Sequence, residues 1–557
     1  MKSTVVLSYL KIRTESRMNY LVSSFNWSCF TTTVLNCLVL GAASVLLYAL
    51  TKKRSSGLKT PWPEVAGRRP FLGNDIGGIE NLVDTVEKWA DIYGKGGIFK
   101  LNLFGTSIYA ICNEKTATLL ESKRPYSITR RKNLVRAMDS LGVKGLFSAE
   151  GDAWQKDRRI VGPALNRKNV REYTEMVKLV TNRLIKKWTT IMKVNVNPNT
   201  ETEEGAVVSI NSDIIATTMD IISLVAFAKD LDSVSKENSY MVDVLNTLFQ
   251  KTMMRVVTPF PYWKIPIIGQ YLDGAGFAAD KAKQYCINCI EDFEDLSETN
   301  NGKIGKIDHD KISNTFLGKV IALNKKSEAS LSTERMVGNL LTMFAAGSET
   351  TAGTMTVALY EIANDKTGLQ DELAREVEAM ENYDSASLED FTKCLPRLRS
   401  LMYEVLRLKG PAPLMGVENE DLITIDGVEL PPHTPFFLMM KYISTREDSD
   451  SAKCCTPRGP RDANLKDFCP RRWLVEDQAN KTISVINPSY RTGFRAFGTG
   501  MRVCPGRDLA EIEILITISS VLRNFKISLE PGHPPMRLVT RLTQTPHCDI
   551  RLMLRPR

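Results

Sequence analysis

The chain has 557 residues, of which 43% are hydrophobic and 25% are charged, and this is the composition of an ordinary globular protein. A formal net charge of +9 without a dense run of Lys and Arg argues against nucleic acid as a partner and fits an anionic membrane surface. The four histidines show no HExxH-type spacing, which leaves little room for a zinc hydrolase. Eleven scattered cysteines predict no disulfide framework, and the CxxC pair of Cys286 and Cys289 lies in a helical pattern that favours burial over zinc.

Residues 29–50 form an apolar segment without a charged side chain. At about 1.5 Å per residue, a helix of this length spans the ~30 Å hydrocarbon core of a bilayer. Lys52, Lys53 and Arg54 follow at once, so the positive-inside rule predicts a single-pass anchor at the endoplasmic reticulum, with the bulk of the chain in the cytosol. The less favoured alternative is a presequence for a mitochondrion or plastid, because residues 1–28 carry several basic side chains and one acid.

The segment after the expected anchor, residues 51–75, is basic and rich in proline. Pro61, Pro63 and Pro70 make it stiff and prevent a continuous helix. We therefore predict a hinge that sets the angle of the following domain to the membrane.

Helical periodicity dominates from about residue 150 to residue 408. The expected helices cover residues 150–166, 170–192, 208–228, 236–255, 276–297, 309–325, 332–363, 367–381 and 395–409. The expected strands are 97–104 and 107–112, which alternate around a turn at Gly105, then 422–430 with a turn at Asp426-Gly427, and 435–443. The polar stretch 449–463 is expected to be a surface insertion. Residues 76–557 are thus predicted to form one mainly α-helical domain with a small β portion.

Ten residues, 497–506, carry the clearest chemical signal in the chain. Cys504 stands in a glycine-rich loop just before a helical pattern at 507–522. Gly498 and Gly506 permit tight turns and leave amide N–H groups free to point at sulfur, and the positive end of the helix favours a thiolate. A deprotonated sulfur suits a haem iron as axial ligand, and Arg502 is well placed for a haem propionate. The alternative is a structural cysteine beside a glycine turn.

This string resembles the haem-binding loop of the cytochrome P450 family, F-x-x-G-x-R-x-C-x-G, at every fixed position. The resemblance implies haem b (iron protoporphyrin IX) as cofactor, with Cys504 as the axial ligand of its iron. It implies that Phe497, Gly498 and Gly506 belong to the loop that holds the haem. The likeness continues past the cysteine as G-x-x-L-A-x-x-E, where Ala510 should pack beneath the porphyrin.

Residues 346–351, Ala-Gly-Ser-Glu-Thr-Thr, lie inside a helical run from 331 to 365. Gly costs about 1 kcal/mol against Ala in a helix, and hydroxyl groups compete for backbone carbonyls, so the run is weakest here. An acid beside an alcohol suits a proton relay, in which Glu349 connects to solvent and Thr350 holds water or dioxygen. The segment resembles the family's oxygen-activation motif, A/G-G-x-D/E-T-T/S, which implies that both residues are catalytic.

Two further short motifs resemble family signatures. Trp154 and Arg158, W-x-x-x-R, are four residues apart in a helical pattern, so the indole N–H and the guanidinium can reach one propionate. A Trp–Arg stacking pair is the alternative. Glu404 and Arg407, E-x-x-R, share one helical face, and Arg472, in a segment resembling F-x-P-x-R-F/W, is expected to join them in a buried structural network.

The resemblance implies a cytochrome P450 fold preceded by one transmembrane helix. It implies a monooxygenase that inserts one oxygen atom from O2 into a lipophilic small molecule. No flavin or nicotinamide domain is evident in the sequence, so electrons are expected from a separate NADPH-dependent cytochrome P450 reductase. Two alternatives remain, a haem-thiolate isomerase or dehydratase acting on peroxides and a haem-binding sensor without turnover. The intact pair of Glu349 and Thr350 favours the monooxygenase.

Overall fold

The computed structural model describes residues 59–70, 72–195, 205–236, 240–258, 261–266, 269–298, 313–327, 330–446, 464–477, 482–488 and 493–557. The chain divides into two units, Met1–Lys59 and Thr60–Arg557, and the described helices and strands belong to the second. The predicted segment 1–28, the anchor at 29–50, residues 51–58 of the hinge and the insertion at 449–463 lie outside the described residues.

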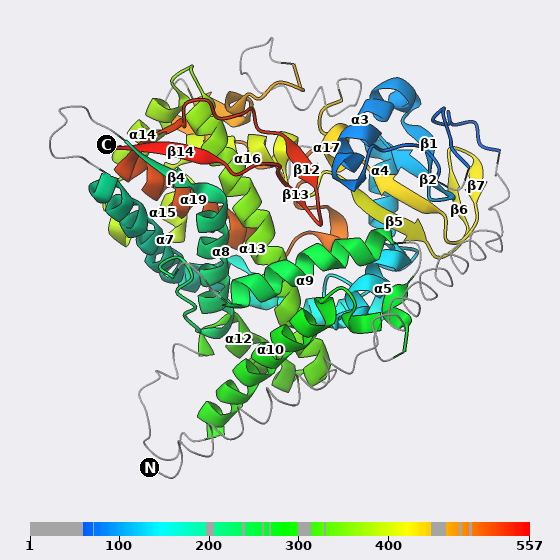
Figure 1. Ribbon diagram of the computed structural model, residues 1–557, viewed down its shortest axis with the longest axis horizontal. Coiled ribbons are helices and arrows are strands. Elements are labelled where there is room, and N and C mark those ends of the chain that lie inside the picture. Colours follow the sequence, from blue (N-terminus) through cyan, green and yellow to red (C-terminus); the bar gives the residue numbers. More distant parts are fainter. Residues whose placement is uncertain are drawn as a thin grey trace, which may run out of the picture. The chain divides into compact units, whose positions relative to one another are not determined.

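Helices dominate the described part of the second unit (Figure 1). In chain order they are α3 (Leu82–Tyr93), α4 (Glu114–Ser122), α5 (Lys132–Ser140), α6 (Gly151–Val161), α7 (Arg167–Asn195), α8 (Ile210–Phe227), α9 (Tyr240–Val257), α10 (Ala275–Glu298), α12 (Phe316–Lys326), α13 (Thr333–Asn364), α14 (Leu369–Glu378), α15 (Leu388–Cys394), α16 (Pro396–Lys409), α17 (Met440–Ile443) and α19 (Arg507–Asn524).

The strands are short and form small sheets. They are β1 (Ile98–Leu103), β2 (Thr106–Ile111), β3 (Ile128–Arg130), β4 (Ala206–Ser209), β5 (Met415–Asn419), β6 (Ile423–Ile425), β7 (Val428–Leu430), β8 (Pro435–Leu438), β9 (Leu474–Asp477), β10 (Thr482–Val485), β11 (Phe525–Leu529), β12 (Leu538–Thr540), β13 (Gln544–Pro546) and β14 (Arg551–Pro556). The largest sheet has the order β1-β2-β8-β5-β3, in which only the β2–β8 pair is parallel. A second sheet has the order β11-β14-β4.

The hairpin predicted around Gly105 is confirmed. Strands β1 and β2 pair antiparallel down to Leu103 opposite Thr106, and the two turn residues, Phe104 and Gly105, both have positive φ. The Asp426-Gly427 turn between β6 and β7 is likewise confirmed. The strand predicted at 435–443 is wrong in its second half, because β8 ends at residue 438 and α17 follows. An apolar run of this length fits either structure, and only the partners of β8 decide between them.

Helix α13 lies at the centre of the core. Figure 1 shows it crossing the middle of the second unit, with α8 and α9 beside it and β1, β2 and β5 gathered to one side. It packs on α8, α16 and α19, and most of its residues from Met336 to Ile362 are buried. The Ser332 hydroxyl caps its first turn by accepting from the amide of Arg335.

Among the helices of the described residues, α8 is the one whose length and composition would suffice to cross a membrane. However, 72% of it is buried inside the protein. Its Asp213 accepts a hydrogen bond from the indole of Trp188 at 2.7 Å, inside the core. We therefore assign α8 to the protein interior, because a helix buried in a protein core is as apolar as one that spans a membrane.

Candidate active site

The loop that holds Cys504 is a tight turn. The amide of Cys504 donates to the carbonyl oxygen of Phe497 at 2.8 Å, which closes the loop. Gly498 and Gly500 have φ of 70° and 62°, a backbone conformation that side chains disfavour. Because α19 starts directly after its N-cap Gly506, the cysteine lies just before the positive end of that helix.

The other loop residues expected to hold the cofactor keep part of their surface accessible, as the cysteine does. These are Phe497, Gly498, Gly506 and Ala510. The amide of Ala510 donates to the carbonyl oxygen of Gly506 at 2.9 Å, so Ala510 completes the first turn of α19. The guanidinium of Arg507 lies 5.8 Å from the centre of the Phe497 ring.

Cys504 is exposed, yet its thiol is desolvated. Burial raises the pKa of the Cys504 thiol, and the amide of Gly506 and the charges of Arg158 and Arg507 offset this only in part. The helix end lowers the pKa of the thiol, as expected, but the loss of hydration has the larger effect in the chain alone. A bound metal cation would deprotonate the thiol.

Helix α6 brings Trp154 and Arg158 to this loop. The Arg502 guanidinium stacks on the Trp154 ring, 4.8 Å from its centre, and also donates to the carbonyl oxygen of Leu146 at 3.1 Å. Arg158 lies close enough to Cys504 for its positive charge to lower the pKa of the thiol. Arg502 rather than Arg158 thus covers the Trp154 ring.

A buried cluster of positive charge surrounds Arg502. Arg124, just before β3, and Arg130, the last residue of β3, lie near it, and the charge of Glu150 acts on all three. Burial lowers the pKa of Arg502 to about 10. Within the described residues, Nε of Arg502 and both Nε and Nη2 of Arg124 are buried and donate no hydrogen bond. Buried N–H groups without acceptors fit anionic carboxylates, so the residues present fit the propionates of a haem.

Sequence reasoning noted Arg130 as nearby positive charge without a role, and it did not identify Arg124 or the ion pair of Arg495 with Glu121 at 3.1 Å. Arg495 precedes the cysteine loop, and Glu121 lies near the end of α4. No fixed spacing links these residues, and the run of arginines around β3 is the one signal that could have drawn attention to two of them.

The segment of α13 expected to activate oxygen stays helical throughout. Ala346 is exposed although most of α13 is buried, and Thr350, one turn later, is half-buried on the same face. The Thr350 hydroxyl donates to the carbonyl oxygen of Ala346 at 2.6 Å. Burial raises the pKa of Glu349, and the neighbouring Thr543 and Arg541 offset the rise in part. An accessible, small-residue face in a core helix, with an acid and an alcohol beside it, can accommodate a small molecule and move protons.

Glu404, Arg407 and Arg472 meet in the protein interior. Glu404 accepts two hydrogen bonds from Arg407, at 2.8 and 2.9 Å, and one from Nε of Arg472 at 2.9 Å. The Trp473 indole and the Cys469 amide donate to the same carboxylate at 3.0 and 2.9 Å. Burial alone would raise the pKa of Glu404, but Arg407, Arg472 and the Cys469 amide together hold it below its ordinary value.

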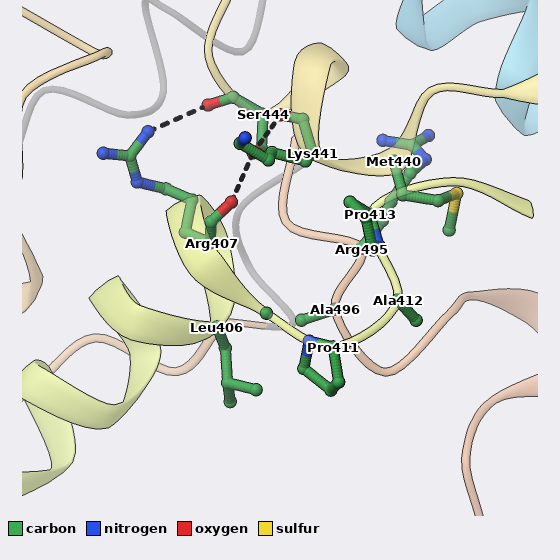
Figure 2. A pocket seen from close by; sticks show the side chains of 11 residues that line it. Leu406, Arg407, Pro411, Ala412, Pro413, Met440, Lys441, Ser444, Arg495 and Ala496 are labelled. Atoms are coloured by element: carbon green, nitrogen blue, oxygen red, sulfur yellow. Dashed lines mark hydrogen bonds between the residues drawn. The ribbon is translucent and has the colours of Figure 1, made fainter. Parts of the chain in front are cut away.

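The network continues into the crevice shown in Figure 2, which the end of α16, residues 410–413 and α17 line. The Arg407 guanidinium donates to the carbonyl oxygen of Ser444 at 3.3 Å, and the Ser444 hydroxyl donates back to that of Arg407 at 3.3 Å. The crevice has room for about one water molecule. It therefore serves packing between α16 and α17 rather than ligand binding.

A chain of contacts joins the first turns of α13 to the cysteine loop. Asn339 on α13 donates to Asp157 of α6 at 3.3 Å and accepts from the amide of Leu146 at 2.7 Å. The carbonyl oxygen of Leu146 in turn accepts from Arg502. Gly338 packs so closely on residues 144–145 that a Cβ there would clash with their backbone.

The mainly helical fold and the order of its motifs define the class of haem-thiolate enzymes. A family model described as Cytochrome P450 matches residues 63–452 and 461–549. The chain belongs to the cytochrome P450 family and is a cytochrome P450 monooxygenase. Proteins of this family bind haem iron and use O2 with electrons from a redox partner.

Relatives with curated names come from several kinds of organism. The chain is 26% identical to Protein LUTEIN DEFICIENT 5, chloroplastic, of Arabidopsis thaliana over 88% of this chain and 76% of that protein. It is 23% identical to the mitochondrial sterol 26-hydroxylase of Mus musculus over 81% of this chain and 80% of that protein. It is 24% identical to the bifunctional cytochrome P450/NADPH--P450 reductase of Aspergillus oryzae over 87% of this chain and 41% of that protein.

Proposed function

We propose that the chain binds haem b with Cys504 as axial thiolate ligand and inserts one oxygen atom from O2 into a lipophilic small molecule. A separate NADPH-dependent cytochrome P450 reductase supplies the electrons. The observation that carries this proposal is the position of Cys504 in a closed loop directly before α19, with the positive charge of Arg158 near its sulfur. Membership of the family supports the reaction class.

Two groups of residues would hold the haem. Phe497, Gly498, Gly506 and Ala510 would contact it around the cysteine. Arg502, Trp154, Arg158 and Arg124 would bind the propionates, and Nε of Arg502 and Nε and Nη2 of Arg124 are buried donors that lack an acceptor among the described residues. When bound, haem supplies the oxygen and electron chemistry, and a thiolate ligand favours O–O cleavage.

Glu349 and Thr350 handle protons at the accessible face of α13. A buried carboxyl with a raised pKa keeps its proton longer than an exposed one, so Glu349 is suited to deliver it. The Thr350 hydroxyl already donates to the carbonyl oxygen of Ala346, which leaves its lone pairs to accept a hydrogen bond from a water molecule. The apolar alanines of this face favour a lipophilic substrate, and one relative is named for its action on a sterol.

Replacing Cys504 by Ser tests the ligand assignment. We expect the carbon monoxide difference spectrum of the ferrous protein to lose its thiolate-type Soret band, because serine offers no sulfur to the iron. Cys469→Ser and Cys548→Ser, at two partly accessible cysteines, should keep the band. Survival of the band in Cys504→Ser, or its loss in either control, would refute the assignment. Turnover of peroxides by the wild type without a reductase would favour the isomerase or dehydratase.

A further inference from the structure

Glu418, Glu420 and His433 bring three ligand atoms to one point beside β3, at the end of the five-stranded sheet. One carboxylate oxygen of each acid and one ring nitrogen of His433 all lie within 4.8 Å of one another. Glu418 belongs to β5 and Glu420 follows two residues later, so both side chains leave the chain on the same face. His433 comes from the connection between β7 and β8.

Each carboxylate is anchored through one oxygen and presents the other. Oε1 of Glu420 accepts from the Thr129 hydroxyl at 2.8 Å, and Oε2 of Glu418 accepts from the amide of Lys132 at 3.3 Å. The Glu418 side chain is 10% exposed, and within the described residues its Oε1 accepts no hydrogen bond. Positive charge stabilises such a buried oxygen, and the Lys132 ammonium, 3.7 Å away, supplies it without a hydrogen bond.

The backbone of His433 is fixed by a rigid turn. Its φ is 65°, which is uncommon for a residue other than glycine, and its amide donates to the carbonyl oxygen of Asn419 at 2.7 Å. The buried Asn419 side chain accepts from the amide of Thr434 at 2.7 Å and donates to the carbonyl oxygen of Pro431 at 2.9 Å. From this backbone, Nδ1 of His433 lies 3.9 Å from Oε1 of Glu418 and 3.7 Å from Oε2 of Glu420.

The ammonium of Lys132 lies where these atoms converge. Its Nζ is 3.2 Å from Oε2 of Glu420, 3.7 Å from Oε1 of Glu418 and 2.9 Å from Nδ1 of His433. Since an ammonium only donates, Nδ1 presents a lone pair to it, as it would to a metal ion. The Lys132 side chain is 41% exposed, so it can swing into water while the three ligand residues stay in place.

We propose that this cluster is a binding site for a divalent cation of the zinc class, in exchange with the Lys132 ammonium. Two carboxylate oxygens and one imidazole nitrogen, with a fourth position for water, are a ligand set that Zn²⁺ takes in proteins. The anchored outer oxygens fix the ligands before the metal arrives. Lys132 is the first residue of α5, and its backbone amide keeps donating to Oε2 of Glu418 while its ammonium moves into water.

Calorimetric titration of the haem-loaded full chain with Zn²⁺ tests the site. Lys132→Met removes the competing ammonium and should bind zinc at least about tenfold more tightly than the wild type. In that background, His433→Asn should weaken binding by about tenfold or more, and asparagine tolerates the positive φ. His547→Asn, at an exposed histidine elsewhere, is the matched control and should leave the affinity unchanged.

X-ray absorption at the zinc edge, which haem iron does not disturb, should show one imidazole in a shell of oxygen and nitrogen ligands. Equal zinc affinity with and without Lys132 would overturn the proposal. So would zinc binding that His433→Asn leaves intact, since the metal would then lie elsewhere. Failure of Lys132→Met to bind zinc would show that the cluster is an ion-pair network only.

Discussion

Thr350 makes a hydrogen bond that limits what its hydroxyl can do. With its proton engaged by the Ala346 carbonyl oxygen at 2.6 Å, the hydroxyl accepts from a neighbour more readily than it donates. Glu349, whose pKa burial raises, is then the better source of protons. In our proposal, Thr350 therefore holds water and Glu349 supplies the proton.

Thr350→Ala should keep haem binding and NADPH consumption but divert oxygen from product to hydrogen peroxide. General acid–base assistance contributes typically 10²–10⁴-fold, so the ratio of product to peroxide per NADPH should fall by at least about tenfold. Thr342→Ala is the matched control, because that hydroxyl makes the same bond, to Gly338 at 2.8 Å, two turns earlier in α13. An unchanged ratio in Thr350→Ala would mean that protons take another route.

At the scale of elements, α16 is held by buried carboxylates near both ends. Glu376, from α14, accepts from the amides of Arg397 and Leu398 at 2.8 and 3.0 Å and so caps the first turn. Glu404, toward the other end, gathers Arg407 and Arg472. Both acids are buried. Glu404 is paired with two arginines, whereas Glu376 has only Arg397 near it among the described residues.

Arg472→Ala should destabilise the fold by roughly 3–5 kcal/mol, because it removes a partner of the buried Glu404 carboxylate. Haem retention should fall with it. Arg471→Ala is the matched control, since Arg471 is 61% exposed and pairs with Glu372 at the surface. Its cost should stay within about 1 kcal/mol. Denaturant unfolding measures both, and equal effects of the two substitutions would contradict the network's structural role.

Loss of the Glu376 proton should lower the free energy of unfolding as the pH rises. Burial raises the pKa of Glu376 from 4.5 to about 7, although the two amides and Arg397 oppose the rise. The protonated acid therefore favours folding below about pH 4.5, and this contribution, at most about 3 kcal/mol, is lost as the pH rises to about 7. The melting temperature of Glu376→Gln relative to wild type should increase from pH 5 to pH 8. Glu378→Gln, at an exposed position, should show no such trend.

The long helices and the short motifs could be predicted from sequence because both depend on local spacing. The run around Thr350 and the pair of Glu404 and Arg407 are examples, since a helix places such residues on one face. Strands of three or four residues, such as β3 and β4, carry too few alternations to be recognised. Arg124 could not be connected with the cysteine loop either, because only the tertiary fold brings residues so far apart in sequence together.

At the scale of the whole molecule, we propose that the first 58 residues determine where the enzyme works. The uncharged span 29–50 and the basic residues after it support our proposal of an anchor in the endoplasmic reticulum. Two relatives are named as chloroplastic and mitochondrial, which keeps an organelle presequence as the rival. An anchor would keep residues 29–50 in the mature protein, whereas a presequence would be removed from it.

Carbonate washing of microsomes should leave the protein in the membrane, and protease added outside should digest its catalytic domain. Both results follow if residues 29–50 span the bilayer with the large unit in the cytosol. Deletion of residues 1–50 should release the protein into the carbonate supernatant. A mature N-terminus after residue 50, or a catalytic domain that resists the protease inside an organelle, would instead establish import.

The contacts of Gly338 and Asn339 connect α13, which carries Glu349 and Thr350, to the loop that holds Cys504. Residues 144–146 press backbone against backbone on α13, and Arg502 is tied to the carbonyl oxygen of Leu146. Because no side chain lies between the two backbones, a displacement of α13 is passed directly to residues 144–146. A molecule that tilts the first turns of α13 would therefore displace Arg502 through Leu146. Binding beside α13 should then change the surroundings of the cysteine loop on the other side.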